Sequence, residues 1–172
     1  MRRLGVIVAL GALLGIFAAG LTDSPALAGR GSKWEFVPAT PFAVPASYCG
    51  FAIQVTPVSN EYIKVLKTPD GSEIDLITGS FTQSYTNMST GRTITENGSA
   101  SARLTTNADG SGTVVSTGPT PIFLDPADAQ RFGLPTVSVA AGALTYSVDP
   151  DGNLTALSLH GHVLTDVCAA LS

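Results

Sequence analysis

The chain has 172 residues and a formal net charge of −4, with 13% charged residues, 18 glycines and 11 prolines. This length fits one domain of ordinary size, and a hydrophobic fraction of 44% excludes an intrinsically disordered chain. A mildly acidic chain without a basic run offers no electrostatic attraction to nucleic acids or anionic membranes, so we expect no nucleic-acid partner.

The N-terminus, residues 1–28, has the three parts of a secretory signal peptide. A positive start at Arg2 is followed by an apolar stretch over 4–21, and then by small residues at Ala26 and Ala28 that fit a cleavage site. The alternative is a retained membrane anchor, because the apolar stretch nearly reaches the length of a spanning helix. Its glycines and the cleavage triplet favour export. We therefore expect cleavage after Ala28 and a secreted, extracellular protein with no stable membrane anchor after cleavage.

After the signal, residues 29–47 are expected to form an irregular lead-in, and residues 48–172 a single antiparallel β domain. The domain contains short runs rich in β-branched and alternating residues, each bounded by turn-forming pairs. These runs are 51–58, 61–67, 73–78, 81–88, 92–96, 101–106, 113–116, 136–140, 143–148 and 154–160. The pairs between them include Ser59-Asn60, Asp70-Gly71, Asn97-Gly98, Asp109-Gly110, Ala141-Gly142 and Asp151-Gly152. Such pairs are typical of hairpin turns, in which the central residues need positive φ.

Helical signals are confined to two short stretches. Residues 126–132 fit one or two turns with Asp125 as the N-cap and Gly133 closing the helix. Residues 163–171 fit a short C-terminal helix. We therefore predict an all-β fold, an antiparallel β-barrel of about 8–10 strands with a short C-terminal helix, because consecutive hairpins favour a barrel. A β-sandwich is the alternative.

The two cysteines, Cys49 and Cys168, lie near the two ends of the β domain. In an oxidising compartment two lone cysteines usually pair, so we predict a disulfide bond that stabilises the fold. The alternative is two buried free thiols. A metal or redox role is not indicated, because the sequence has no Cys-x-x-Cys motif.

Two features bear on what the protein binds. The stretch 78–120 is rich in Ser and Thr, which fits either strands with one wet face or a polar-lined cavity or surface that faces saccharides. It lacks clustered aromatics, so the wet face is favoured. Trp34, Phe36 and Phe42 gather in the lead-in, where packing over the sheet is the default and contact with a partner is the alternative.

His160 and His162 are the only histidines. At i and i+2 on a strand they share a face, and a third ligand from a neighbouring strand would make them a zinc or copper site. Exposed histidines at a strand end are the simpler interpretation, so we expect no metal and no other cofactor. No catalytic residues are assigned, because the sequence has no Gly-x-Ser-x-Gly elbow and Glu73 and Asp75 fit a solvated face beside a turn.

Several short motifs together suggest a family. They are Cys49-Gly50-Phe51, Glu61-Tyr62, Thr90-Gly91, Asn97-Gly98-Ser99, Gly161-His162-Val163 and the ending from Thr165 to Leu171. In these the chain resembles a group of small secreted actinobacterial proteins. The resemblance implies a secreted β-rich domain, with a barrel like that of allene oxide cyclases as one form. It brings no catalytic residues with it.

We therefore expect a secreted, disulfide-bonded β domain that is not an enzyme and binds a small apolar ligand or an extracellular protein partner. A barrel of this size can enclose one small apolar molecule. One alternative is an isomerase- or cyclase-like enzyme with a site inside a barrel. Another is a structural protein of the cell envelope or spore surface.

Overall fold

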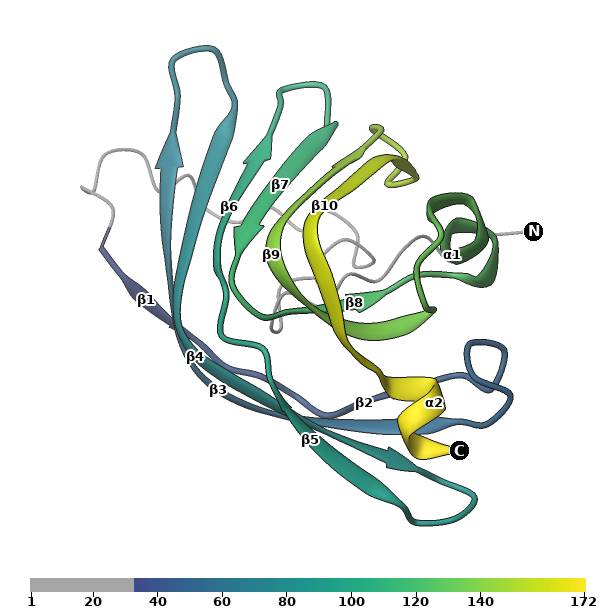
Figure 1. The fold of residues 1–172 in the computed structure, drawn as a ribbon. Coiled ribbons are helices and arrows are strands. Elements are labelled where there is room, and N and C mark those ends of the chain that lie inside the picture. Colours follow the sequence, from purple (N-terminus) through teal and green to yellow (C-terminus); the bar gives the residue numbers. More distant parts are fainter. Residues whose placement is uncertain (1–32) are drawn as a thin grey trace.

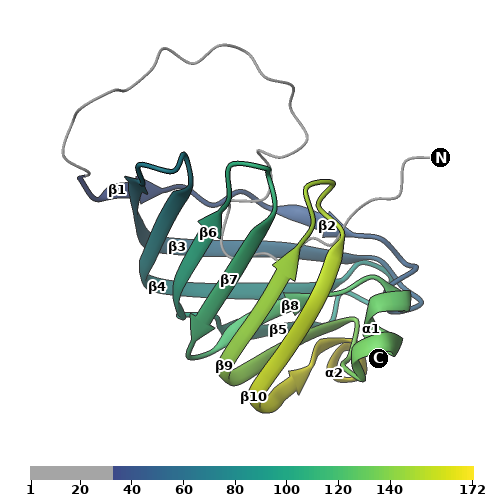
Figure 2. The same ribbon diagram turned by 90° about the horizontal axis from the view of Figure 1, so that it is seen from above.

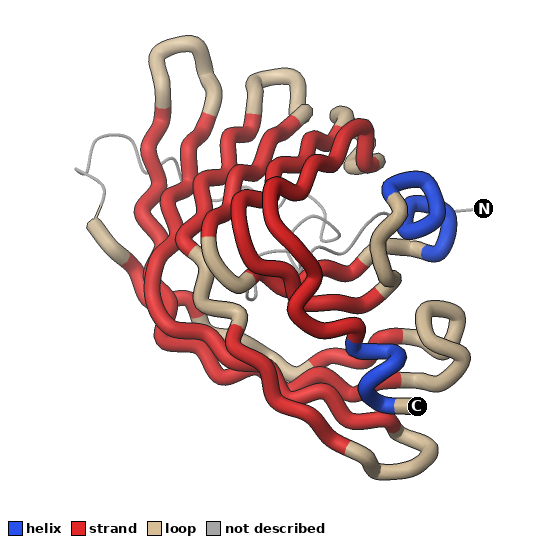
Figure 3. The backbone as a smooth tube through the Cα atoms, viewed as in Figure 1, coloured by secondary structure: helices blue, strands red, loops and turns tan. Residues whose placement is uncertain are grey.

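The computed structural model describes residues 33–172, and the predicted signal peptide and its cleavage site lie outside that range. The strands of this part are β1 (Glu35–Val37), β2 (Phe42–Val44), β3 (Ile53–Lys67), β4 (Glu73–Asn87), β5 (Thr93–Asn97), β6 (Ser101–Thr106), β7 (Gly112–Thr117), β8 (Thr120–Phe123), β9 (Val137–Val148) and β10 (Leu154–Asp166). Its helices are α1 (Pro126–Phe132) and α2 (Val167–Leu171). Strands therefore dominate, and helices are short and peripheral (Figures 1 and 3).

The strands form one antiparallel sheet in the order β1-β3-β4-β6-β7-β9-β10, with β2 also beside β3, β5 beside β4 and β8 beside β9. The predicted all-β antiparallel class with a short C-terminal helix is confirmed. The lead-in is less irregular than expected, because β1 and β2 are two short strands that both pair with β3.

The predicted barrel is wrong, because the sheet does not close. β1 and β10 are the two ends of the sheet order and do not pair with each other, and Figure 2 places them at opposite edges. β8 occupies the concave side of the curved sheet instead (Figure 1), and all four of its residues are buried. Hairpin spacing is the same in a barrel and in a bent open sheet, so the sequence pattern did not separate the two.

The sheet bends where a glycine lies in the middle of a long strand. Gly79 of β4 is opposite Glu61 of β3, and Gly142 of β9 is opposite Gly161 of β10. Gly79 has φ 137° and Gly142 has φ 121°, values that side chains disfavour. The β3–β4 and β9–β10 hairpins are both strongly curved (Figure 1), and a glycine in the middle of a strand allows such a bend.

Two of the expected turns are interior positions of continuous strands. Ser59-Asn60 lies inside β3, which pairs without interruption with β4 over fifteen positions. Ser59 is accommodated because its hydroxyl donates to the carbonyl of Val37 at 3.0 Å and accepts from the amide of Glu61 at 3.1 Å. Ala141-Gly142 is likewise inside β9. Asn97-Gly98 joins β5 to β6, which both pair with β4 and not with each other.

The helix predicted over 126–132 is confirmed as α1. The carboxylate of Asp125 accepts from the amides of Ala127 and Asp128, both at 2.8 Å, and Gly133 ends the helix in a left-handed conformation. The C-terminal helix is shorter than the expected 163–171, because β10 continues to Asp166, which still pairs with Ser138 of β9. α2 begins at Val167, where the Asp166 carboxylate accepts from the amide of Ala169 at 3.0 Å.

The core has two parts. One lies between β8, α1 and the sheet from β4 to β10, and its buried members are Ile77, Ala102, Val114, Ile122, Leu124, Ala129, Ala140, Leu144, Tyr146 and Leu154. The other lies near α2 and contains Val44, Ile53, Val55, Tyr85, Phe123, Val137, Val139, Val167 and Leu171. β8 and β9 contribute to both parts, so they join the two halves of the bent sheet.

Cys49 and Cys168 lie at disulfide distance beside the second core, with Cα atoms 5.2 Å apart, within the usual range for a disulfide. This agrees with the predicted pair. Within residues 33–172, no helix has the length and apolar character needed to span a membrane.

Candidate functional site

An exposed aromatic cluster lies where β1 pairs with β3. Phe36 is directly opposite Tyr62, and their ring centroids are 6.0 Å apart at 70°, an edge-to-face contact. Phe36 is 53% exposed, Tyr62 40% and the neighbouring Trp34 48%. We call Trp34, Phe36 and Tyr62 the aromatic cluster. Large exposed aromatics that gather in one place usually mark an interaction surface.

A surface of neutral polar side chains adjoins the aromatic cluster on β3 and β4. Thr78 of β4 is opposite Tyr62, and Ser80 is opposite Asn60, and all of these are exposed. Because successive side chains of a strand point to opposite faces, Asn60 and Tyr62 share one face. We call Asn60, Thr78 and Ser80 the hydroxyl surface.

The same chemistry continues onto β5. The hydroxyls of Ser84 and Thr95 are 2.8 Å apart, and those of Thr86 and Thr93 are also 2.8 Å apart. These cross-strand hydrogen bonds hold the side chains in fixed positions on an exposed face. Hydroxyls and amides both donate and accept hydrogen bonds, so this face suits a ligand that is itself rich in hydroxyls.

Sequence reasoning placed the aromatics and the hydroxyls in separate regions, and the β1–β3 pairing brings them together. The Ser/Thr-rich stretch has no aromatic cluster of its own, but Trp34 and Phe36 come to its edge from the lead-in. Phe42 does not join them, because it packs against Phe123 with ring centroids 5.6 Å apart. A period-two pattern over 34–37 was the available signal, too short to assign a strand.

A small pocket lies inside the fold near β2. It is lined by Phe42, Ala43, Val44, Pro45, Tyr48 and Phe123 and has a volume of about 20 Å³. That is room for about one water molecule, whereas sites for drug-sized ligands usually measure at least about 300 Å³. This pocket gives no support to an enclosed apolar ligand.

Two carboxyl groups are buried on the inner face of the β3–β4 hairpin. Glu61 is 3% exposed and Asp75 7%, and one oxygen of each has no hydrogen-bond partner. Burial raises the pKa of Glu61 from 4.5 to about 7, which contact with the Ser59 hydroxyl offsets in part. Burial and the charge of Glu73 raise the pKa of Asp75 from 3.8 to about 6. The expected solvated face for Asp75 is therefore wrong.

These two carboxyls do not form a catalytic pair. Glu61 is opposite Gly79, which lies four residues along β4 from Asp75, so the two groups are separated by about 13 Å along the strands. Paired carboxylates in glycoside hydrolysis lie about 5 to 9.5 Å apart around an open cleft. Neither group lines the small pocket.

Replacing Glu61 with glutamine is expected to stabilise the protein above neutral pH. The pKa of the Glu61 carboxyl is higher in the folded state than in the unfolded one. The stability linked to its protonation is therefore fully present below about pH 4.5 and is lost as pH rises through about 7. The shift corresponds to about 3 kcal/mol. Denaturant unfolding at about pH 4 should give similar free energies for Glu61→Gln and wild type, and at about pH 8 a more stable variant.

The exposed Glu35 of β1 provides the control for that comparison. Glu35→Gln removes the same charge from the same part of the sheet and should leave the wild-type pH dependence in place. A Glu61→Gln protein that loses stability between pH 4 and 8 as steeply as wild type would show that another group is responsible.

His160 and His162 are both exposed on β10, opposite Ala143 and Ala141 of β9. The imidazole Nε2 of His160 is 3.4 Å from the hydroxyl of Ser158, so these two side chains lie on one face of β10. His162 lies on the same face, because alternate residues of a strand point to the same side. Within residues 33–172 no group of three or more His, Cys, Asp or Glu side chains could hold a metal ion. The described part of one chain therefore supplies two potential ligands on β10 and no third.

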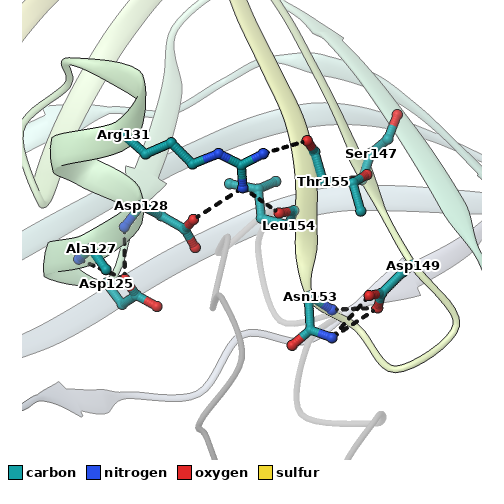
Figure 4. Close-up of polar contacts among 9 residues, drawn as sticks. All are labelled: Asp125, Ala127, Asp128, Arg131, Ser147, Asp149, Asn153, Leu154 and Thr155. Carbon is teal, nitrogen blue, oxygen red and sulfur yellow. Dashed lines mark hydrogen bonds and ion pairs between the residues drawn. The ribbon is translucent and has the colours of Figure 1, made fainter.

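The segment from Asp149 to Asn153 is a hairpin turn, as predicted. The Asp149 carboxylate accepts from the backbone and side-chain nitrogens of Asn153 at 2.8 to 3.1 Å (Figure 4). These bonds use the carboxylate to close the turn.

Searches of protein-family models, of curated proteins and of solved structures find no match to this chain.

Proposed function

We propose that the protein is an extracellular, non-enzymatic binding module, and that it binds a neutral polysaccharide on the outer face of β3 and β4. The observation that carries this proposal is the position of the aromatic cluster next to the hydroxyl surface. The export signal expected at residues 1–28 would deliver the module to the compartment in which such chains occur.

The chemistry of the two neighbouring surfaces matches a sugar chain. The apolar faces of sugar rings pack on exposed aromatic rings, and Trp34, Phe36 and Tyr62 each keep 40% or more of their area accessible. Sugar hydroxyls can exchange hydrogen bonds with the amide of Asn60 and the hydroxyls of Thr78 and Ser80. The side chains of this hydroxyl surface carry no charge, which favours a neutral polymer over an acidic one.

The other candidate functions have less support. An enclosed apolar ligand needs more room than the 20 Å³ pocket offers. An enzyme inside a barrel needs convergent polar groups in a cleft, whereas Glu61 and Asp75 are buried and far apart. An extracellular protein partner at the aromatic cluster is an outcome that the following experiment separates from a glycan.

We expect the purified protein to bind insoluble neutral polysaccharides, with cellulose and chitin as the first probes, and to be retarded in gels containing soluble neutral glucans. Trp34→Ala and Tyr62→Ala should each weaken binding about tenfold or more, because exposed aromatics at the centre of an interface commonly contribute 1 to 2 kcal/mol or more. Depletion assays and affinity electrophoresis measure this effect.

Met88→Ala is the matched control, because Met88 is 59% exposed but lies outside the aromatic cluster. It should bind like wild type. If none of the neutral glycans is bound, or if the Trp34→Ala/Tyr62→Ala double variant binds as wild type does, the polysaccharide proposal is excluded. Retention of a protein partner that the double variant no longer captures would assign the aromatic cluster to protein binding instead.

A further inference from the structure

β10 is a long strand with one free edge. It has thirteen residues, lies at the end of the sheet order and pairs with β9 on one side (Figure 2). Its sequence from Leu154 to Val163 contains no Lys, Arg, Pro, Asp or Glu. Exposed edges usually carry such residues, because an unprotected row of amides and carbonyls can pair with another chain.

The two ends of β10 are blocked, and its centre is not. The guanidinium of Arg131 on α1 donates to the carbonyls of Leu154 and Thr155 at 3.1 and 2.9 Å (Figure 4). At the other end the hydroxyl of Thr165 donates to the carboxylate of Glu96 at 3.0 Å. The pairing of β10 with β9 is also irregular between 154 and 156 and between 163 and 165, so the regular part of β10 is its centre.

The unblocked centre of β10 is nearly symmetric in sequence. It reads Leu159-His160-Gly161-His162-Val163, so a histidine and then an aliphatic residue flank Gly161 on each side. Antiparallel pairing of this segment with a second copy, centred on Gly161, would set His160 of one copy opposite His162 of the other at both pairs. Such directly opposed residues have Cβ atoms about 4.5 to 5.5 Å apart.

We propose that two copies of the chain pair along β10 around Gly161, and that the four imidazoles of His160 and His162 from both copies form a site for a zinc ion. Each chain holds half of the ligand set, and the second copy completes it. This inference is independent of the polysaccharide site, which lies at the β1 side of the sheet.

The geometry of one chain suits this site. His160 and His162 are both exposed on one face of β10, and their partners on β9 are Ala143 and Ala141, whose small side chains leave the imidazoles room to reorient. A twofold axis perpendicular to the plane of the sheet leaves the same face of both copies on the same side. All four imidazole rings therefore lie together on that face. Zinc takes four such nitrogen ligands in tetrahedral geometry.

The bend at Gly161 is compatible with this pairing. A twofold rotation about the local normal of the sheet preserves the direction in which the strand bends, so both copies curve to the same side. The symmetric segment is short, and we therefore expect pairing to depend on the metal, with monomers in its absence.

Sedimentation velocity of untagged protein tests the proposal. Zinc chloride should convert a monomer into a dimer with one zinc ion bound for two chains, and EDTA should reverse the change. His160→Ala and His162→Ala should each abolish the zinc-dependent dimer. Both side chains are exposed, so the variants should unfold like wild type, as checked by thermal denaturation.

Ser158→Ala is the matched control, because Ser158 lies on the same face of β10 but supplies no imidazole, and it should dimerise with zinc as wild type does. Ser158→Lys places a charge beside the paired edge and should weaken the dimer while both histidines remain. A protein that stays monomeric with zinc, or a zinc-dependent dimer that survives loss of both histidines, overturns the proposal.

Discussion

Gly79→Ala is expected to lower the free energy of unfolding by more than an ordinary single substitution does. A Cβ atom at this position would lie 2.3 Å from the carbonyl oxygen of Asn60 and 2.6 Å from the Cα of Glu61. Both are backbone atoms of the facing strand, so no side chain can move aside. Relief would require separating β3 from β4 at the bend, and we expect a loss of at least about 4 kcal/mol, a large part of the stability of an ordinary domain.

The comparison with Gly91→Ala separates this clash from the general cost of replacing a left-handed glycine. Gly91 has φ 75°, and a Cβ there has no atom within 4 Å. Gly91→Ala should therefore lose about 1 to 2 kcal/mol, the cost of the left-handed backbone alone. Circular dichroism and denaturant unfolding measure both variants. Similar losses for the two would mean that the bend at Gly79 accommodates a side chain.

The elements that could be predicted from sequence are those with local signals. α1 has an Asp N-cap, a proline in its first turn and a closing glycine, and all three act within one segment. The hairpin turns at Asp70-Gly71 and Asp151-Gly152 have the same advantage. The disulfide pair was accessible because only two cysteines had to be matched.

The long strands could not be delimited from sequence, because their continuity depends on the partner strand. Ser59-Asn60 has the composition of a turn, yet it stays in β3 because β4 pairs with it at every position. Strand pairing overrides local preference here. The chain changes direction at Gly79 and Gly142 instead. A single glycine in a strand indicates a bend only when the strand that pairs with it is known.

The candidate site was missed for a similar reason. Trp34 and Phe36 lie far in sequence from the Ser/Thr-rich stretch, and the pairing of Phe36 with Tyr62 is a long-range contact without a local signal. The two histidines could be identified from sequence, but their lack of a third ligand within residues 33–172 could not. That lack depends on which strands neighbour β10.

Removing the disulfide should be the second large effect. The chain-entropy model gives about 5 kcal/mol for a cross-link that closes a loop of this length, and the sequence separation of Cys49 and Cys168 is 119 residues. We expect the Cys49→Ser/Cys168→Ser variant to lose about 3 to 5 kcal/mol in denaturant unfolding. Its m-value should rise, because an unfolded chain without the cross-link exposes more surface.

The variant should nevertheless fold, because α2 has noncovalent attachments as well. Val167 and Leu171 are fully buried, and the side-chain amide of Asn87 donates to the carbonyl of Leu171 at 3.1 Å. The single variant Cys168→Ser should match the double variant, since either one removes the same cross-link. A double variant within about 1 kcal/mol of wild type would show that these attachments alone fix the C-terminus, since loss of a native disulfide typically costs 2 to 5 kcal/mol.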